Sequence, residues 1–332
     1  MKVIQVLNTW EYFGAENVAI GICEGLREQG VEVAYASRIG SIQDVLRQHG
    51  IRYIGLKNVS VREVRKMIRR EDADVVHAHD MFASVICALA TIGTKCKLVT
   101  MLHNNGFENR RVSVKSVAYL VAMIRACRAF FVSRTTYEGY IFHKWFDKKS
   151  EVLGNIIDVD GVIERGTGVG KHWDIVYVGR LFVQKNPLRL IRVIGMIRDI
   201  KPELKVAIVG NGEMTEETRE EVKRLGLEKN VELMGFREDA IEIMAASKVM
   251  LMTSRWEGTP MVVLEAMALH VPVVATPVDG LKEVVNGKWL CEKDEELVAA
   301  VVDLLDNGCD GYVWHVGMSR VQYIGRLMSA YA

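Results

Sequence analysis

The sequence predicts an α/β fold made of two domains, each with a parallel sheet covered by helices. The chain has 332 residues, a length that favours two domains of roughly 150 residues each. Short apolar runs alternate with helical patterns in both halves, as parallel α/β sheets require. Between residues 155 and 171 this alternation lapses and four glycines cluster: Gly161, Gly166, Gly168 and Gly170. We therefore expect the domain boundary in that segment.

The first half begins with an apolar strand and continues as a strand–helix alternation. The expected strands are residues 2–7, 32–36, 52–56, 75–77, 97–102 and 129–132. The expected helices include residues 14–29, 42–49 and 61–70. Residues 1–155 should form one domain.

The second half restarts the same alternation. Its expected strands are residues 174–178, 205–209, 231–234, 249–254 and 271–276. Its expected helices are residues 188–200, 215–225, 239–246 and 295–305. Residues 156–318 should form the second domain, and a closing helix at 319–332 should pack back toward the first.

Composition limits the classes of protein that this chain can belong to. Hydrophobic residues make up 49% of the chain, enough for two cores. The longest helical apolar stretch, residues 117–124, is far shorter than the roughly 18 residues that span a bilayer. The first seven residues are too short an apolar run for a signal peptide, and the six cysteines form no C-x-x-C pair. We expect a cytoplasmic protein that is soluble or peripheral on the membrane.

The segment from Glu257 to Glu265 places two carboxylates with seven residues between them. Pro260 suits the first position of a helix, and Thr259 would then be its N-cap. The free N–H groups of that helix start suit a phosphate, and a carboxylate on either side can accept hydrogen bonds from sugar hydroxyls. Two glutamates at this spacing also occur by chance. Because strand-like runs flank the segment, its loop should lie at the carboxyl edge of a parallel sheet, where ligands bind.

Glycines and charged residues recur after three other predicted strands of the second half. Gly179 permits a tight turn, and Arg180 and Lys185 bring two cations that could stabilise a departing pyrophosphate. A solvated basic loop is the alternative. Gly210 and Gly212 follow the next strand, where a tight turn is equally consistent. Phe236 follows the third, either as a stacking surface for a base or as a cap of the core.

Several further motifs occur in a fixed order along the chain. They are residues 10–16 (W-E-Y-F-G-A-E), 74–79 (D-V-V-H-A-H), 100–103 (T-M-L-H) and 155–158 (N-I-I-D). With the loops of the second half, they resemble the retaining glycosyltransferases of the E-x7-E type, the family 4-like "glycosyl transferases group 1". The resemblance covers nearly the whole chain. It implies the GT-B fold, in which two Rossmann-like domains face each other across a cleft.

The resemblance also implies a role for each matched residue. Arg180 and Lys185 would hold the donor diphosphate, Glu257 would contact the transferred sugar, and His103 would lie against that sugar. The implied catalytic residues are Arg180, Lys185, Glu257 and His103. The implied donor-binding residues are Gly14, Gly179, Gly210, Gly212, Phe236, Gly258, Thr259, Pro260, Met261 and Glu265, with Glu265 on the ribose hydroxyls. Glu16 and His103 would bind the acceptor. From the residues alone, a core histidine is the alternative for His103.

Two short motifs suggest metals that we do not expect. Asp158-Val159-Asp160 mimics a metal-binding D-x-D pair, but Arg180 and Lys185 already supply positive charge. His77 and His79 share a strand face, yet no third ligand stands at a useful spacing. We expect no metal and no cofactor, with a nucleotide-diphosphate sugar (UDP-, GDP- or ADP-linked) as co-substrate.

Charge is unevenly distributed between the halves. Residues 1–150 carry 22 Lys and Arg against 14 Asp and Glu, whereas residues 151–332 carry 21 against 28. The basic segment 61–70 and Arg110, Arg111 and Lys115 suggest docking on an anionic membrane surface and a lipid-linked or other sugar acceptor. An ordinary solvated helix face is the alternative. Nucleic acid is not favoured, because no binding motif or interleaved aromatic residues occur.

The resemblance therefore implies a retaining, metal-independent transferase that moves a hexose-type sugar to a glycolipid, lipid-linked oligosaccharide or polysaccharide. Retention would follow from same-face attack, with the leaving diphosphate taking the proton of the acceptor. A nucleotide-sugar 2-epimerase on the same fold is one alternative, and a non-catalytic partner subunit that binds nucleotide sugars is another.

Overall fold

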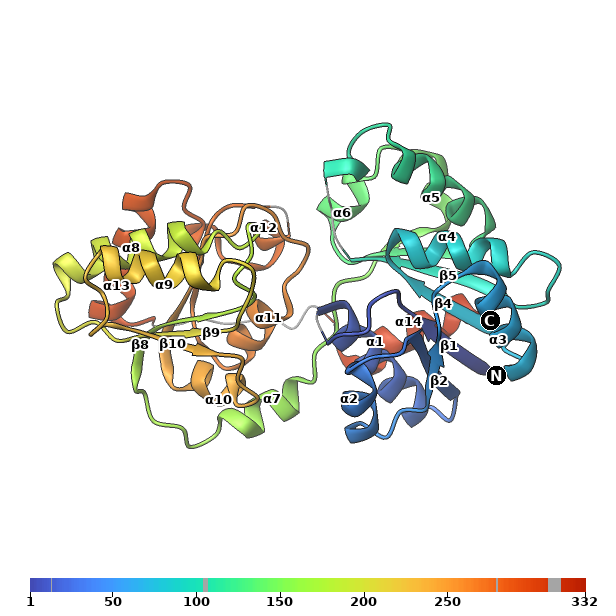
Figure 1. Ribbon diagram of the computed structural model, residues 1–332, viewed down its shortest axis with the longest axis horizontal. Coiled ribbons are helices and arrows are strands. Elements are labelled where there is room, and N and C mark those ends of the chain that lie inside the picture. Colours follow the sequence, from blue (N-terminus) through green and yellow to red (C-terminus); the bar gives the residue numbers. More distant parts are fainter. Residues whose placement is uncertain (13, 104–106, 279, 310–317) are drawn as a thin grey trace. The chain divides into compact units, whose positions relative to one another are not determined.

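The computed structural model describes residues 1–12, 14–103, 107–278, 280–309 and 318–332. Phe13, which belongs to the first-loop motif, lies outside these residues. The chain divides into two compact units (Figure 1), which are Met1–Ile157 with Val316–Ala332, and Asp158–His315. Each unit contains one parallel sheet with helices packed on it, so the predicted α/β fold is confirmed.

Within the described ranges, the sheet of the first unit has seven parallel strands in the order β3-β2-β1-β4-β5-β6-β7. The strands are β1 (Lys2–Val6), β2 (Glu32–Arg38), β3 (Tyr53–Leu56), β4 (Val75–His79), β5 (Lys97–Leu102), β6 (Arg128–Phe131) and β7 (Ser150–Val152). The sequence predicts all but β7, a three-residue edge strand too short to give a periodic signal. The strand order reverses between β1 and β4.

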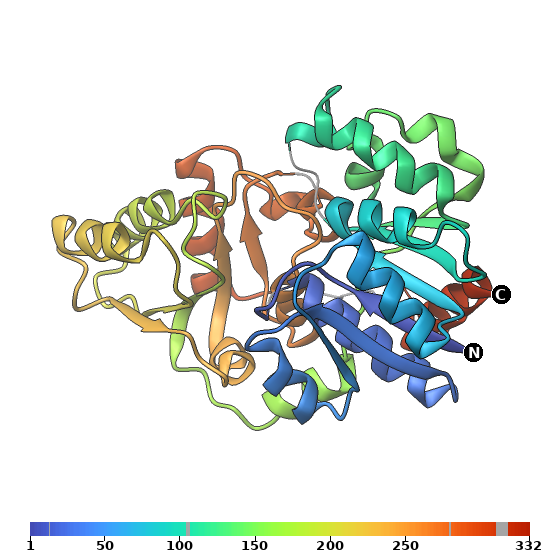
Figure 2. The same cartoon turned by 45° about the vertical axis from the view of Figure 1, so that its right-hand side comes forward.

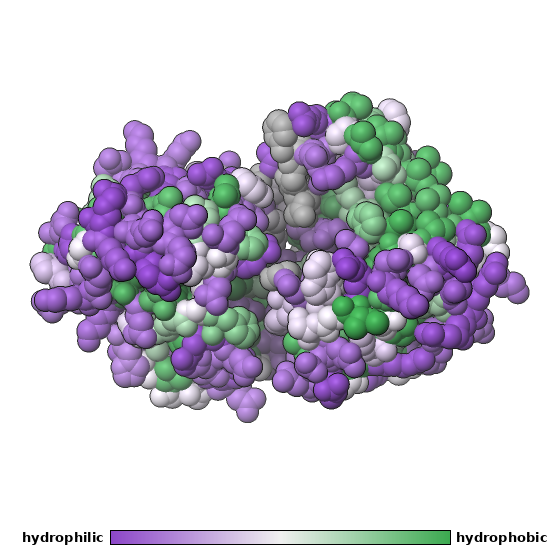
Figure 3. All heavy atoms as spheres, viewed as in Figure 1, coloured by the Kyte–Doolittle hydropathy of each residue, from purple (hydrophilic) through white to green (hydrophobic). Residues whose placement is uncertain are grey.

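Helices surround this sheet. They are α1 (Gly14–Glu28), α2 (Ile42–Gln48), α3 (Val61–Glu71), α4 (Asp80–Ala90), α5 (Val114–Arg125), α6 (Arg134–Gly139) and α14 (Arg320–Tyr331), with the 3-10 turns η1 (Phe107–Asn109) and η2 (His143–Lys149). Because helices cover the sheet, its central strands are buried on both sides, and all five residues of β4 are buried. Figure 3 shows hydrophobic side chains gathered on the surface over α4 and α5.

The closing helix α14 belongs to the first unit. It packs against α1 and β5 (red in Figure 2) and buries Ile324, Leu327 and Tyr331. The Tyr331 hydroxyl lies 2.8 Å from Nδ1 of His77 on β4. At the edge of the sheet, Arg326 pairs with Glu151 of β7 at 2.7 Å. The first unit is therefore built from two separate stretches of the chain.

The described sheet of the second unit has five parallel strands in the order β10-β9-β8-β11-β12. The strands are β8 (Trp173–Val178), β9 (Val206–Val209), β10 (Val231–Gly235), β11 (Ser247–Met252) and β12 (Val273–Ala275). The helices are α7 (Val159–Gly166), α8 (Pro187–Ile200), α9 (Thr215–Arg224), α10 (Ala240–Ala245), α11 (Met261–Ala268), α12 (Leu281–Val284) and α13 (Asp294–Asn307), with the 3-10 turn η3 (Gly287–Trp289). Its strand order reverses between β8 and β11.

Helix α7 corrects one expectation, because it lies where the sequence predicts an irregular segment. The Asp158 carboxylate caps the helix by accepting a hydrogen bond from the Gly161 amide at 3.2 Å. Val162 is buried, and a Cβ added to Gly166 would collide with Leu269. Gly166, one of the glycines that resemble a linker, therefore allows this short helix to pack closely on Leu269.

No helix in the described part of the chain is both long enough and apolar enough to cross a bilayer.

Candidate active site

Two of the predicted donor loops lie at the switch point of the second sheet, where the strand order reverses between β8 and β11. The chain leaves the sheet after β8 through Gly179 and Arg180, and after β11 through the loop that holds Glu257. Because β8 and β11 are adjacent and parallel, both loops lie at the same sheet edge. In open α/β sheets, ligands bind where such neighbouring loops diverge.

Lys185 and Glu257 form the central pair of this site. The Lys185 Nζ lies 2.6 Å from Oε1 of Glu257, and both side chains are largely buried. Gln184, which the sequence analysis does not single out, donates to the second carboxylate oxygen at 3.3 Å and to the Trp256 carbonyl at 3.0 Å. An ammonium group has three N–H donors, so Lys185 can hold Glu257 and still bind an anion.

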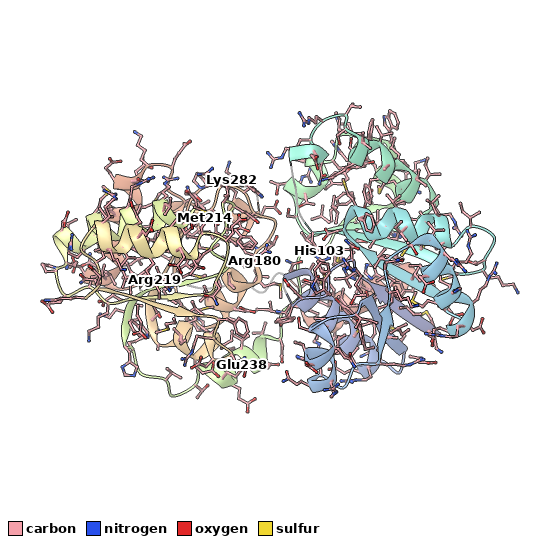
Figure 4. All side chains as sticks on the ribbon, in the orientation of Figure 1. His103, Arg180, Met214, Arg219, Glu238 and Lys282 are labelled. Carbon is pink, nitrogen blue, oxygen red and sulfur yellow. The ribbon has the colours of Figure 1, made fainter. Side chains whose placement is uncertain are left out.

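Hydrogen bonds to the backbone at Arg180 and Leu181 fix the position of Arg180 at the end of β8. Its carbonyl oxygen accepts a hydrogen bond from the Tyr177 hydroxyl at 3.0 Å, and the following amide, of Leu181, donates to the Asn211 carbonyl at 3.0 Å. The guanidinium of Arg180 (labelled in Figure 4) lies 4.6 Å from the ring centroid of Phe182, a cation–π distance. These contacts limit the positions open to a half-buried cation before any ligand binds.

Glycines let the loops of this edge approach one another closely. Gly210 has φ +128°, and a Cβ there would collide with the Gly179 carbonyl oxygen. A Cβ on Gly212 would collide with the Leu181 carbonyl. The predicted donor-binding glycines of these two loops thus pack backbone against backbone. Gly280, which the sequence analysis misses, packs in the same way on the carbonyl of Gly258.

Helix α11 begins one residue later than predicted. Pro260 is its N-cap, with φ −69° and ψ 129°, and Met261 is the first helical residue. The expectation of Pro260 at the first helical position and Thr259 as the cap is therefore wrong. The ring fixes φ near the same value at either position, so sequence alone cannot separate them. Glu257 precedes the helix and Glu265 lies in its second turn, as expected.

Glu265 is half-buried, and no described residue donates a hydrogen bond to its carboxylate. Burial raises its pKa to about 7, with a small opposing effect of Arg165. That arginine is committed elsewhere, because it pairs with Glu242 at 2.8 Å. A carboxylate kept in a poorly solvated position without a donor is suited to accept hydrogen bonds from ligand hydroxyls. At the end of β10, the exposed ring of Phe236 is available for stacking.

The first unit holds His103 at the end of β5 (Figure 4), in a chain of hydrogen-bonded groups. The His103 Nε2 lies 2.7 Å from Nδ1 of His79, whose Nε2 lies 2.8 Å from Oε1 of Gln5. The His103 amide donates to the Asp80 carboxylate at 3.1 Å. His79 ends β4 and His103 follows the adjacent strand β5, but no sequence motif predicts this contact.

Protonation of this chain follows from its burial. Burial lowers the pKa of His103, with Asp80 opposing, and lowers the pKa of His79 further. Both imidazoles are therefore neutral near pH 7, with one N–H each. Because the Gln5 oxygen accepts from His79, the Nδ1 of His79 accepts from His103. That leaves Nδ1 of His103 as an acceptor, suited to a hydroxyl donor.

Of the two predicted residues that follow the first loop, Gly14 is exposed and Glu16 is buried. Gly14 begins α1, is exposed, and has no atom within 4 Å of the position that a Cβ would take. Glu16 is buried and accepts a hydrogen bond from the Thr9 hydroxyl. Its carboxylate therefore holds the loop in the ligand-free chain.

The metal-like motifs have other partners. Asp158 caps α7, and His77 bonds to Tyr331. Among the described residues, no group of three His, Cys, Asp or Glu side chains is arranged to hold a metal ion.

Two parallel-sheet units, each with polar loops at a switch point, define the GT-B class of α/β protein. Anabaena Alr3699/HepE in complex with UDP-glucose has this fold and aligns with a TM-score of 0.82 at 22% identity, over 100% of this chain and 95% of that chain. The predicted GT-B fold is thus confirmed.

Family models identify the chain further. "Glycosyltransferase Family 4" matches residues 13–160, and "Glycosyl transferases group 1" matches residues 173–307. The chain belongs to the family 4, group 1 glycosyltransferases, as its motifs predict.

Two relatives show the range of the similarity. A UDP-Gal:alpha-D-GlcNAc-diphosphoundecaprenol alpha-1,3-galactosyltransferase of Escherichia coli is 28% identical over 67% of this chain, and the match spans 62% of that relative's length. A protein of Haemophilus influenzae described as an uncharacterized glycosyltransferase is 24% identical over 95% of this chain and 93% of its own length.

Proposed function

We propose that this chain is a retaining glycosyltransferase that moves a hexose-type sugar from a nucleotide diphosphate to a lipid-linked or polysaccharide acceptor. The observation that carries the proposal is the Lys185–Glu257 pair, set beside Arg180 at the switch point of the second sheet. A cation pair for a diphosphate and a carboxylate for a sugar are what such a donor requires. The name of the E. coli relative supports a lipid-linked acceptor.

The donor would be held by residues that surround the switch point. Arg180 and the free protons of Lys185 would bind the diphosphate, together with backbone amides of the segment from Gly258 to Met261. Glu265 would accept hydrogen bonds from the ribose, and Phe236 would stack on the base. The donor is UDP-, GDP- or ADP-linked, and the UDP-glucose complex of the Anabaena relative favours UDP.

Transfer would depend mainly on electrostatic stabilisation of the leaving group. As the bond to the sugar breaks, negative charge grows on the diphosphate beside Arg180 and Lys185. The same diphosphate would take the proton of the attacking hydroxyl, which enters from the same face and so retains the configuration. Because two cations supply this charge, we propose that transfer needs no divalent metal, and that chelation leaves the rate unchanged.

The first unit would contribute the remaining contacts. Nδ1 of His103 would accept a hydrogen bond from the donor sugar or from the acceptor. Gly14 would allow close approach of the first loop, and Glu16 would keep that loop in place for the acceptor. We propose that the reaction takes place in the cytoplasm or at the cytoplasmic face of the membrane, where the enzyme would reach a lipid-linked acceptor.

Nucleoside-diphosphate release from a panel of UDP-, GDP- and ADP-sugars tests the proposal. We expect one donor to be turned over, and Lys185→Ala to reduce the rate by about 100- to 1,000-fold, the effect of removing one charge-stabilising donor. Lys248→Ala is the matched control, since it removes an exposed lysine from a 2.9 Å pair with Asp174. Nucleotide binding without release from any donor would instead indicate the partner subunit. Conversion of the donor to its C2 epimer would indicate the epimerase.

A further inference from the structure

The outward face of α5 is apolar along its whole length. Val114, Val117, Val121 and Ile124 are 88%, 45%, 40% and 70% exposed. Their spacing of three, four and three residues places them in one stripe of the helix. The opposite face is the one that packs into the unit, through Tyr119, Ala122 and Met123. Helix α5 therefore has two apolar faces, and the first unit covers only one of them.

Neighbouring residues extend this stripe. The Lys149 Nζ donates to the carbonyl oxygens of Ile124 and Ala126 at 3.1 and 3.0 Å, which brings η2 to the end of α5. Trp145 of η2 is exposed, and its ring lies 5.0 Å from that of Phe142. At the other end of α5, Val112 is exposed just before the helix. Figure 3 shows this hydrophobic area over α5.

Cationic side chains border the apolar surface. Lys144 and Lys148 are exposed on η2 beside Trp145, and Lys115 is exposed on the first turn of α5 next to Glu108. Arg110 and Arg111 are exposed just before the same helix. An apolar stripe with basic flanks and a tryptophan is the composition of helices that lie in the headgroup region of anionic membranes.

We propose that α5 and η2 form a lipid-docking surface that binds bilayers rich in anionic lipid. Contiguous exposed apolar surface of this kind marks an interaction site. A second copy of the chain fits less well, because lysines around the two stripes would meet like charges. The inference deepens the proposed function and rests on it for its purpose, since docking would bring the transferase to a lipid-linked acceptor.

The structure also decides between two basic groups that suggest membrane docking. The sequence points to Arg110, Arg111 and Lys115 beside α5, and also to the basic segment 61–70, which forms most of α3. There, Val64, Met67 and Ile68 are buried in the core of the first unit, so α3 presents only its polar face. Its apolar residues therefore cannot enter a bilayer, whereas those of α5 already face outward.

Sedimentation with vesicles tests the proposal directly. We expect the full chain to bind vesicles of phosphatidylglycerol and phosphatidylcholine, and to bind less at high salt. The double variant Val114→Asp, Ile124→Asp should lower the bound fraction at least about tenfold, because two apolar side chains on the stripe become charged. The double variant Val321→Asp, Ile200→Asp is the control. Those residues are 73% and 55% exposed, also lie near helix ends, and should leave binding unchanged.

A second measurement guards against loss of folding in the variants. Trp145 emission should shift to the blue when vesicles are added, and Trp145→Phe should remove that part of the change. Nucleoside-diphosphate release in the absence of vesicles should be the same in wild type and stripe variants, so that failed docking is distinguished from failed catalysis. The proposal is overturned if the wild-type protein does not bind anionic vesicles, or if both double variants lose binding equally. It is also overturned if light scattering shows a dimer that dissociates only in the stripe variant.

Discussion

At the residue scale, Glu265 shows how the binding role proposed for it can conflict with stability. Its carboxyl group is half-buried, is not a hydrogen-bond acceptor for any described residue, and has a pKa near 7 because burial disfavours its charge. In the unfolded chain, the same group loses its proton near pH 4.5. Between these values the folded chain holds more protons than the unfolded chain, so stability falls as pH rises from about 4.5 to 7.

Glu265→Gln should therefore stabilise the second unit at pH 8 by on the order of 2 kcal/mol, after discounting for partial exposure. It should leave stability near pH 4.5 almost unchanged and should weaken nucleotide binding. Thermal unfolding across pH 4.5–8, with and without UDP, checks both effects. Glu217→Gln, an exposed carboxylate on α9, is the control and should alter neither. A variant that gains no stability at pH 8 would contradict this account.

His79 should act as a positioning residue for His103. His79→Leu removes the partner of the His103 Nε2 and should lower kcat/KM about three- to tenfold, the usual net worth of one hydrogen bond. His79→Asn places an amide near the lost Nδ1 and should restore part of the activity. If Leu and Asn variants are equally impaired while both remain folded, the role of His79 is packing alone.

Sequence reasoning predicts which residues lie together at the candidate site better than it predicts their contacts. Arg180, Lys185 and Glu257 stand out because glycines and charges follow predicted strands. That His79 meets His103 depends on the register that pairs Ala78 with Thr100, which no local pattern specifies. The same limit applies to Gly280. A side chain there would collide with the carbonyl oxygen of Gly258, which lies 22 residues earlier in the chain.

At the element scale, strands are predicted well because apolar runs of buried parallel strands are continuous. Strand β5 matches its expected range of 97–102, and helix α1 ends one residue before its expected end. Failures occur where an element is short or rich in glycine, as with β7 and α7. The exposed stripe of α5 was also missed, because periodicity shows that a helix has an apolar face and not whether another element covers it.

Helix α5 should depend on its N-terminal cap. Ser113 accepts a hydrogen bond from the Ser116 amide at 3.1 Å, and Ser116 bonds back to the Ser113 amide at 2.8 Å. Ser113→Ala should lower the free energy of unfolding by about 1 kcal/mol, as measured by urea denaturation. Ser41, at the N-cap of α2, makes no capping bond with its side chain. Ser41→Ala is the control, and an equal loss there would argue against the cap as the cause.

At the scale of the whole molecule, the proposed donor contacts are concentrated in one unit. Arg180, Lys185, Glu257 and Glu265 all belong to Asp158–His315, whereas His103 belongs to the other unit. The two units also have opposite charge, since the basic excess lies in the first half of the chain. Nucleotide binding and membrane docking should therefore be separable by variants.

Calorimetry should show this separation. UDP at about 100 times its Kd adds roughly 2.7 kcal/mol to the unit that binds it, which should raise the unfolding transition of the second unit by about 5–10 °C. The transition of the first unit should stay in place. Lys185→Ala should reduce the shift, and the lipid-docking variants should keep it in full. Equal shifts of both transitions would contradict binding within the second unit alone.

The return of α14 to the first unit has a consequence for biosynthesis. Domains usually fold in the order in which the ribosome releases them, N-terminal first. Here the first unit lacks helix α14 until residues 320–331 have been made. Until then Gly25 is not covered by Ile324, and His77 has no hydrogen bond to Tyr331. The second unit is a single uninterrupted stretch. We therefore expect the unit translated second to complete its folding first, while the earlier one waits with part of its core uncovered.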